Sequence, residues 1–359
     1  MLQLAERPPE TATVASLVAD DLKPIVRAID ADGLFPAGVL RRLGEAGAYG
    51  HHLNGRAQDG GLAAAIDDMT QVGAVCLSTA FCMWCQDALA WYLDRSQNRT
   101  AARLYLDAVA SGRQLGGTGL SNPMKAFSGI EPLSLKGVRV PGGYRVNGRL
   151  PWVSNLDDGH LLASIFSLDD GRRVMALFRA GHDAVTLARN ARFIALEGTG
   201  TYSILVRDAF VPDDHVLAED AGTFVPAIRN GFVLLQAGMG LGIARGVAAL
   251  MRSDVRGRKL AAFLPLGPDD IEERADVLRR RVREQAKDAE APDRASFLAV
   301  LRTRLDLSQL ALDAAQSAML QFGARGYVEG SEPFRRLREA QFVAIVTPSV
   351  KHILTELAR

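Results

Sequence analysis

The spacing of apolar residues changes twice along this chain, and the two changes limit the folds that it can adopt. Up to about residue 112, apolar residues recur every three or four positions, as on the buried face of a helix. From about 116 to 214 they alternate in short runs between Gly, Asp and Asn, which is typical of strands in a compact sheet or barrel. Helical spacing then returns until the end. The pattern predicts an α+β chain whose β region lies between two helical regions.

We place three predicted domains at these changes of period: an N-terminal α-helical bundle (1–115), a middle β-barrel or sheet domain (116–217) and a C-terminal four-helix bundle (218–359). The last four helices are expected at 225–254, 268–289, 292–322 and 334–358. The strands are expected at 133–140, 144–153, 160–166, 173–179, 185–187, 191–195 and 201–210, with a polar loop before the first of them.

Two local features refine the helical regions. Ser78 or Thr79 is expected to cap the helix that follows it, because small hydroxyls favour that position. Small residues at four-residue spacing, in the run from Gly238 to Gly242, lie inside a predicted helix rather than between a strand and a helix. They indicate close helix packing and not a phosphate loop.

The composition is that of a globular chain. With 359 residues, 48% hydrophobic content and a net charge of +1, it has enough apolar surface for more than one core. The lack of a basic excess argues against nucleic acid as a partner, since phosphate binding needs a local surplus of Lys and Arg. We expect no leader at Met1, and we expect no apolar run to approach the roughly 20 residues that span a membrane. We expect a cytoplasmic protein with no membrane partner.

The chain has three cysteines, Cys76, Cys82 and Cys85. The last two have C-x-x-C spacing, but they fall in an apolar helical run without a second pair or a nearby cluster of histidines. Zinc and redox sites normally need such partners. We therefore expect buried, reduced thiols and no metal site.

Residues 113–156 carry the clearest chemical signal. One strand ends at Ser121 and Asn122, and a pair of strands joined by the turn 141–143 ends at Trp152 to Asn155. Each end combines a small hydroxyl with backbone donors, and one adds an indole. Two such ends can hold a flat heteroaromatic ring by hydrogen bonds at its edge and stacking on its face. The alternative is an ordinary β-hairpin with a buried Trp and a Ser in a turn.

The same stretch resembles the acyl-CoA dehydrogenase superfamily. The resemblance rests on AARLYLDAVASGRQLGGTGLSNP (101–123) and GGYRVNGRLPWVSN (142–155), and it extends to Gly60-Gly61 before a long helix and to VPDDHVL (211–217). It implies a helical bundle, a β domain and a second helical bundle in series. It also implies an FAD cofactor whose isoalloxazine ring lies between the two strand ends.

The resemblance assigns flavin contacts by position. Ser121 stands at the pyrimidine edge of the ring, Trp152 beside the ring, and the Ser154 hydroxyl near flavin N5. Arg258 and the turn 323–327 match segments that reach the FAD of a neighbouring subunit, which implies a homodimer or homotetramer. The full set of implied flavin contacts is Thr118, Leu120, Ser121, Trp152, Ser154, Arg258, Gly323, Gly326 and Ser349.

The catalytic base of the family is missing from its expected places. In most members a glutamate that removes the substrate α-proton stands where this chain has Thr347, and in others it stands where this chain has Phe232. A threonine hydroxyl is a poor proton acceptor at neutral pH. The catalytic residue is therefore unknown, and the weak candidates are Glu329, Glu332 and His352.

Three functions remain open. The first is an FAD-dependent dehydrogenase that desaturates an acyl thioester with an altered base and passes electrons to an electron-transfer flavoprotein or to oxygen. The second is a monooxygenase that uses FMN or another reduced flavin and needs no α-proton base; the absent glutamate and the altered segment from Asn122 to Ile130 suit it. The third is a flavin-binding or scaffold protein without catalysis.

Overall fold

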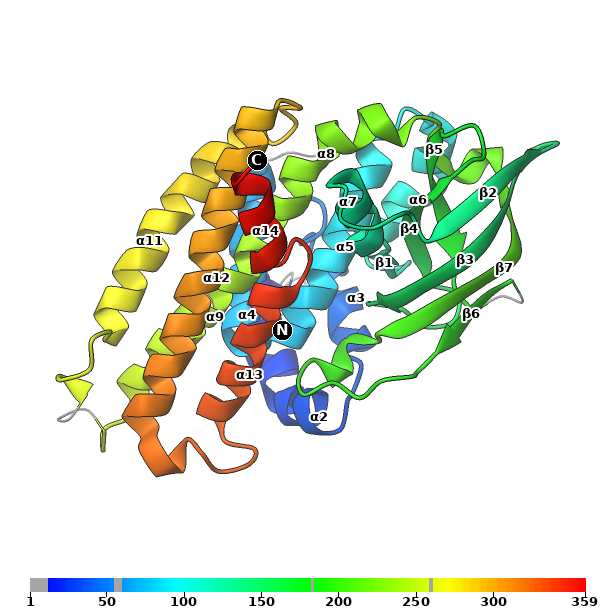
Figure 1. The fold of residues 1–359 in the computed structure, drawn as a ribbon. Coiled ribbons are helices and arrows are strands. Elements are labelled where there is room, and N and C mark those ends of the chain that lie inside the picture. Colours follow the sequence, from blue (N-terminus) through cyan, green and yellow to red (C-terminus); the bar gives the residue numbers. More distant parts are fainter. Residues whose placement is uncertain (1–11, 55–59, 182–183, 258–260) are drawn as a thin grey trace, which may run out of the picture.

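The computed structural model describes residues 12–54, 60–181, 184–257 and 261–359. Figure 1 shows long helices on one side, a twisted sheet on the other, and further helices between them. Along the chain the order is helical, mostly β, then helical, so the predicted α+β fold class is confirmed. The exact domain boundaries stay a prediction.

The first helical region is built around α5, which is buried on every side from Leu77 to Asp94. A helix that is apolar all round has no solvent face, so it becomes the core against which the others pack. It therefore carries Phe81, Trp84 and Cys85 into the interior. The elements of this region are α1 (Val14–Leu17), the π-helical η1 (Val18–Leu22), the 3-10 turn η2 (Lys23–Ile25), α2 (Val26–Ala31), α3 (Ala37–Glu45), α4 (Gly61–Val75), α5 (Leu77–Arg95) and α6 (Arg99–Ala110).

The middle region is a mixed sheet with the order β6-β7-β3-β2-β4-β5-β8, and β1 pairs in parallel with β4. The β2–β3 hairpin turns at 141–143, as the sequence predicts, and Val140 pairs with Gly143. The strands are β1 (Gly116–Thr118), β2 (Leu135–Val140), β3 (Gly143–Val153), β4 (Leu161–Ser167), β5 (Arg173–Arg179), β6 (Val185–Ala188), β7 (Tyr202–Pro212) and β8 (Val216–Ala218); the short helix α7 (Ser121–Phe127) and the 3-10 turns η3 (Glu197–Thr199) and η4 (Asp213–His215) complete the region.

The last region holds the long helices of the bundle. Its described elements are α8 (Ala221–Leu235), α9 (Ala237–Ser253), α11 (Pro268–Gln285), η5 (Ala286–Asp288), α12 (Arg294–Phe322), η6 (Gly323–Arg325), α13 (Glu332–Ile345) and α14 (Val350–Leu357). The run Ala221–Ser253 is long and apolar enough to cross a membrane, so the expectation that no run approaches that length is wrong. The run comprises α8 and α9, and 83% of its most apolar stretch is buried inside the fold, as in the core helices of a globular protein.

Glycines bring α4 and α9 into backbone contact. A Cβ on Gly242 would lie 2.7 Å from the Cα of Gly73, and one on Gly246 would overlap the carbonyl oxygen of Ala74. No larger residue fits at these crossings. The predicted packing role of the glycines near Gly242 is confirmed, and α4 is fixed against the bundle.

Two buried arginines of α13 hold the end of α4. The Nη1 of Arg335 donates to the carbonyl of Val75 at 3.1 Å, and the Nη1 of Arg336 donates to the carbonyl of Gly73 at 3.2 Å. Arg336 also donates to the carbonyl of Ala74. These carbonyls have no partner within their own helix, and a cation near a helix C-terminus is stabilised by the helix dipole.

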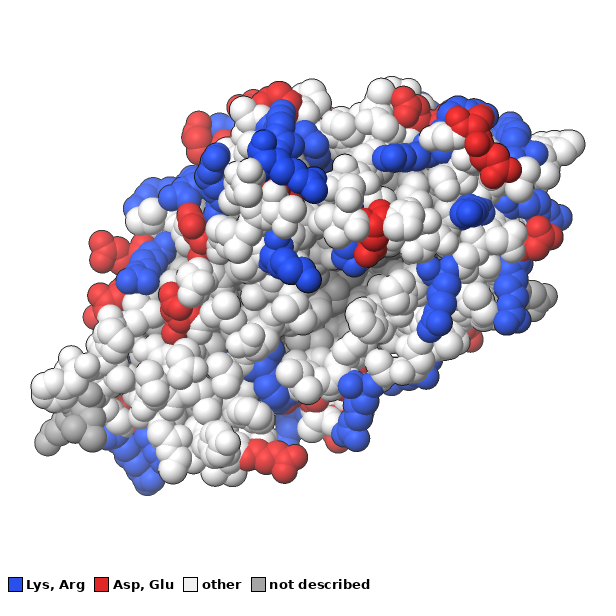
Figure 2. Space-filling model, in the orientation of Figure 1, with Lys and Arg blue, Asp and Glu red and all other residues white. Residues whose placement is uncertain are grey.

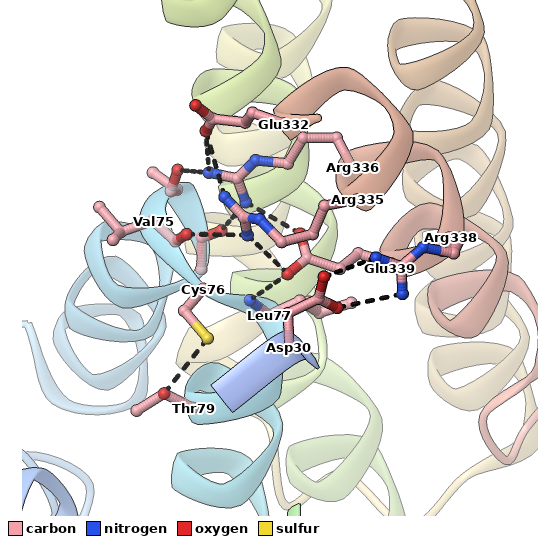
Figure 3. A network of polar contacts seen from close by, with 12 residues as sticks. Asp30, Val75, Cys76, Leu77, Thr79, Glu332, Arg335, Arg336, Arg338 and Glu339 are labelled. Atoms are coloured by element: carbon pink, nitrogen blue, oxygen red, sulfur yellow. Dashed lines mark hydrogen bonds and ion pairs between the residues drawn. The ribbon is translucent and has the colours of Figure 1, made fainter. Parts of the chain in front are cut away.

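Glu339 joins these arginines to the start of α5 (Figure 3). Its Oε1 accepts from the backbone N–H of Leu77 at 3.2 Å and from Arg335 at 2.8 Å, and its Oε2 accepts from Arg336 at 3.0 Å. Burial alone would lower the pKa of Arg335, but the Glu339 carboxylate raises it overall. One buried carboxylate therefore caps α5 and balances two cations, which fixes α13 against α4 and α5. We call these three side chains the Arg335–Arg336–Glu339 cluster.

The structure corrects four local predictions. The helix α5 begins after Cys76 without a side-chain cap from Ser78 or Thr79, because Glu339 from another helix takes that role. Residues 191–195 form no strand. The expected helix 334–358 is two helices, α13 and α14, because Pro348 cannot donate to a continuous helix. The strand expected to end at Ser121 and Asn122, with a polar loop after it, stops at Thr118 instead, and these two residues begin α7.

Loss of the Glu339 charge should destabilise the fold strongly. Glu339→Gln leaves two buried guanidinium groups without their carboxylate, so we expect the free energy of unfolding to fall by about 3–5 kcal/mol. Glu332→Gln is the matched control: this carboxylate contacts the same arginines, but its side chain is 48% exposed, so the loss should be about 0–1 kcal/mol. Urea denaturation of both variants measures the difference. Equal losses would show that the cluster does not hold the helices together.

Candidate functional site

A cavity of about 720 Å³ opens where the sheet meets the helices. Its walls come from α5, the β1–α7 and β3–β4 connections, the segment 193–201, α8, and the α13–α14 junction. Figure 2 shows a hollow with largely uncharged walls in the middle of the molecular face drawn there. The described lining includes these residues that the sequence analysis singled out for the site: Thr118, Ser121, Asn122, Trp152, Ser154, Phe232, Thr347 and Ser349.

A buried amide network fixes the two strand ends at the cavity. The side-chain amide of Asn155 donates to the carbonyl of Gly116 at 2.6 Å and to Oε1 of Gln86 at 3.3 Å. That same Gln86 oxygen accepts from the backbone N–H of Gly116 at 2.9 Å. Asn155 adopts a left-handed backbone conformation, φ 62°, which asparagine tolerates better than most residues. The network places Ser154 at the rim of the cavity, beside β1.

Gly117 allows the two ends to touch. A Cβ at this position would overlap the carbonyl oxygen of Ser154. The Ser154 hydroxyl lies 2.6 Å from that of Thr201, which lies 2.7 Å from that of Thr199. Three hydroxyls thus form a chain along this wall and can offer donors or acceptors to the edge of a ring.

A pair of hydroxyls forms another part of the cavity wall. The Oγ of Ser121, at the start of α7, lies 2.8 Å from the Oγ1 of Thr347. The carbonyl of Thr347 accepts from the side-chain amide of Gln236 at 2.8 Å. Position 347 is therefore at the cavity, as the resemblance implies, but its hydroxyl contacts another hydroxyl.

Aromatic side chains form the inner wall, and the sequence analysis did not single out most of them. Phe81 stacks on Trp84, with ring centroids 5.6 Å apart. Phe342 meets the ring of Phe81 edge-on, with centroids 4.6 Å apart. Phe232 packs against Trp84 at 5.0 Å and is 1% exposed. At the rim, Trp152 meets Phe193 edge-on with centroids 5.9 Å apart and is 58% exposed. The interior of the cavity therefore suits a flat apolar group.

Glu131 is the one acidic side chain among the described residues of the lining. Its Oε1 accepts from the Asn122 side-chain amide at 2.9 Å and lies 3.4 Å from the Nζ of Lys125. Asn122 also accepts from the backbone N–H of Ser134 at 2.8 Å, which closes the loop between α7 and β2. The sequence analysis missed Glu131 because the segment matches no motif there and the loop brings it back to the cavity.

The other predicted catalytic candidates do not line the cavity. Glu332 pairs with Arg335 and Arg336, and Glu329 is exposed on the surface. The Nε2 of His352 lies 2.8 Å from the Ser128 hydroxyl, and burial lowers the pKa of this histidine. None of the three therefore faces a ligand in the cavity.

The remaining predicted contacts lie elsewhere. Leu120 is buried beside the cavity without lining it. Gly323 and Gly326 lie at the far end of α12, away from α7 and α14 in Figure 1. Arg258 lies outside the described residues. The flavin roles assigned by resemblance to all of these positions stay predictions.

The three cysteines lie in the interior of the fold. All three cysteines are free and buried, as predicted, and burial raises the pKa of the Cys82 and Cys85 thiols. Among the residues that the structure describes, no group of three His, Cys, Asp or Glu side chains could hold a metal ion.

Comparison with known proteins gives consistent matches. The family model described as "Acyl-CoA dehydrogenase, N-terminal domain" matches residues 11–113. Short-chain-specific acyl-CoA dehydrogenase of Clostridium acetobutylicum is 22% identical over 92% of this chain and 91% of its own length. Benzylmalonyl-CoA dehydrogenase of Aromatoleum aromaticum is 23% identical over 65% of this chain, and the match spans 63% of that protein. The structure of butyryl-CoA dehydrogenase from Megasphaera elsdenii superposes with a TM-score of 0.82 at 17% identity, covering 96% of this chain and 95% of that one.

The contact at Gly117 is open to a direct test. Gly117→Ala should push the carbonyl of Ser154 away and lower the free energy of unfolding by about 1–3 kcal/mol, because an overpacked site must shift its backbone. Gly38→Ala in α3 is the control. Its Cβ would meet nothing within 4 Å, so it should stabilise the fold by about 0.5–1 kcal/mol. Thermal denaturation compares them, and a neutral Gly117→Ala would refute the close approach.

Proposed function

We propose that this chain binds a flavin in the 720 Å³ cavity and uses it, once reduced, to oxygenate a small, mainly apolar substrate. The chain belongs to the acyl-CoA dehydrogenase superfamily of flavin-dependent oxidoreductases. The observation that carries this proposal is the absence of a carboxylate at both family base positions. Thr347 contacts Ser121, and Phe232 belongs to the aromatic wall.

The cavity has the features that a flavin ring needs. Its volume lies within the range of about 300–1,000 Å³ of small-molecule and cofactor sites. The hydroxyls of Ser154, Thr201 and Thr199 line one wall, and the strand ends are held together by Gly117. The half-exposed indole of Trp152 stands at the rim with a face free for stacking. These residues would hold the ring, and the bound flavin would supply the redox chemistry.

The hydroxyl pair argues against the desaturation of ordinary acyl thioesters. Removal of the α-proton needs a base within hydrogen-bond reach of it. The Ser121 and Thr347 hydroxyls can donate or accept a hydrogen bond, but neither accepts a proton permanently at neutral pH. An oxygenation that begins from reduced flavin and oxygen requires no such base from the protein.

Glu131 supports a second candidate function, a dehydrogenase with a relocated base. It is the one acidic side chain in the described lining, and a carboxylate is the group that the reaction lacks at position 347. Its oxygen is engaged by Asn122 and lies near Lys125, so it is held as an ion-pair partner in this arrangement. The comparison of Glu131→Gln with the wild type separates this candidate from the first.

A homodimer would complete the flavin site at its other end. The segment after α9 and the turn after α12 lie side by side, since Arg325 pairs with Asp254 at 2.9 Å and Gln321 donates to the carbonyl of Met251 at 2.7 Å. Large apolar residues stand exposed on these segments: Val255, Phe263, Tyr327 and Val328. Such a surface is typical of a contact between subunits. We propose that it meets a second copy of the chain, with oxygen as the electron acceptor at the completed site.

Thr347→Glu should add the missing base. We expect the flavin-loaded wild type to show weak or no bleaching by straight-chain acyl-CoA under anaerobic conditions, and Thr347→Glu to raise the bleaching rate roughly tenfold or more, because a positioned base contributes about 10²–10⁴-fold. Thr347→Gln is the control of equal size without a proton-accepting carboxylate. Wild-type turnover at about 1–10³ per second would contradict the proposal, and its loss in Glu131→Gln would identify that residue as the base.

Tyr327→Asp should weaken both the dimer and flavin binding. The added charge would lie in the proposed subunit contact, where the tyrosine is 81% exposed in the single chain. Leu104→Asp on α6, outside this surface, is the control. Light scattering and flavin titration at micromolar concentration measure the two effects. A wild-type monomer that binds flavin fully would exclude the shared site.

A further inference from the structure

Arg304 of α12 is a buried cation without an acidic partner among the residues that the structure describes. It is 2% exposed, yet it forms no ion pair. Its Nε donates to Oε1 of Gln236 at 2.8 Å, and its other nitrogens donate to the Ser308 hydroxyl and the Val343 carbonyl. Burial lowers the pKa of Arg304 to about 10, and no described carboxylate offsets that effect. Because this pKa is still well above neutral pH, the side chain carries its positive charge there.

Such an arrangement is costly, because buried charges are normally paired. Well-packed apolar residues would stabilise the same place at least as well. The stability of the bundle therefore does not explain why Arg304 is charged. The hydrogen bonds of Arg304 connect it to the cavity, where a charge can serve binding.

Gln236 transmits the charge to the cavity wall. This residue is fully buried between α8 and α9. Its carbonyl oxygen faces Arg304 and its amide group faces the carbonyl of Thr347, at 2.8 Å in each case. The amide dipole is thus oriented with its positive end toward Thr347. Beyond it, the Thr347 and Ser121 hydroxyls lie 2.8 Å apart, and one of them retains a proton that it can donate into the cavity.

The other charges at the cavity do not cancel this effect. Lys125 and Glu131 are the charged side chains of the described lining, and they lie 3.4 Å apart as a pair of opposite sign. The aromatic wall of Phe81, Trp84, Phe232 and Phe342 is uncharged. The positive charge behind Thr347 is therefore not balanced by any described neighbour.

We propose that Arg304, acting through Gln236, positions Thr347 and makes the Ser121–Thr347 wall a binding site for the charged end of an aromatic anion. The anion has two possible sources: a substrate that carries a carboxylate or phenolate, or the ring of the reduced flavin. The second source rests on the proposed function, and the first does not.

Gln236→Glu tests the proposal directly, and the thermal unfolding temperature of the variant checks that it is folded. The new carboxylate keeps the size of the side chain, pairs with Arg304, and removes both the donor to Thr347 and the net charge. Ser308→Ala is the matched control, because it removes one neutral acceptor of Arg304 and leaves its charge and its contact with Gln236 unchanged. Arg304→Lys, which keeps the charge, should retain part of the wild-type behaviour.

Two measurements distinguish the sources. Calorimetric titration with benzoate and with benzyl alcohol reports on a substrate anion; we expect Gln236→Glu to lower the ratio of the two affinities about tenfold or more. The midpoint potential of the bound flavin reports on the ring. A tenfold weaker preference for the reduced form would lower it by about 30 mV for a two-electron couple.

The outcomes separate this inference from the proposed function. If neither the affinity ratio nor the potential changes in Gln236→Glu, or if Ser308→Ala changes them equally, the role of Arg304 is refuted. If the protein takes up no flavin, the proposed function fails, and the benzoate titration of the flavin-free protein still decides the inference.

Discussion

The buried Arg335–Arg336–Glu339 cluster is the contact on which the rest of the arrangement depends. Its arginines bind the carbonyls at the end of α4, and Glu339 caps the start of α5. The cluster thereby fixes α13, which leads to Phe342 and Thr347, against α5, which carries Phe81 and Trp84. The two helical walls of the cavity are aligned by charge and helix dipoles rather than by apolar packing alone. Arg338 adds a second tie, since it pairs with Asp30 and donates to the carbonyl of Ile194 at 2.6 Å, next to the cavity-lining Phe193.

The sheet supplies the third wall of the cavity, and a different kind of interaction holds that wall in place. Where the helices are joined by charges, β1 and the end of β3 are joined by the Gln86–Asn155 amide network and by the missing side chain of Gly117. The charged cluster and the amide network both hold hydroxyl groups at the cavity. Neither of them places a carboxylate at the position of the family base. The fold matches that of acyl-CoA dehydrogenases, while a threonine stands where the family base is expected, which is why we place oxygenation ahead of desaturation.

Periodicity and motif spacing predicted much of this structure. The β2–β3 hairpin, the packing role of the glycines near Gly242 and the buried cysteines all follow from local patterns. The family resemblance, rather than a local pattern, pointed to Thr347, which lines the cavity. What the sequence did not reveal depends on distant contacts. The cap of α5 comes from a residue 262 positions away, and Glu131 reaches the cavity through a loop closed by Asn122. Arg304 matters because no acidic side chain in the described part of the chain pairs with it. No local pattern encodes such facts.

The reaction of the reduced, flavin-loaded protein with oxygen tests the central claim most directly. Rapid mixing with air-saturated buffer, followed by flavin absorbance, gives its rate. The account predicts reoxidation by oxygen on the timescale of enzyme turnover, at about 1 per second or faster, without any protein acceptor. Reduced flavin that stays stable toward oxygen but is reoxidised rapidly by an electron-transfer flavoprotein would contradict the account and identify a dehydrogenase.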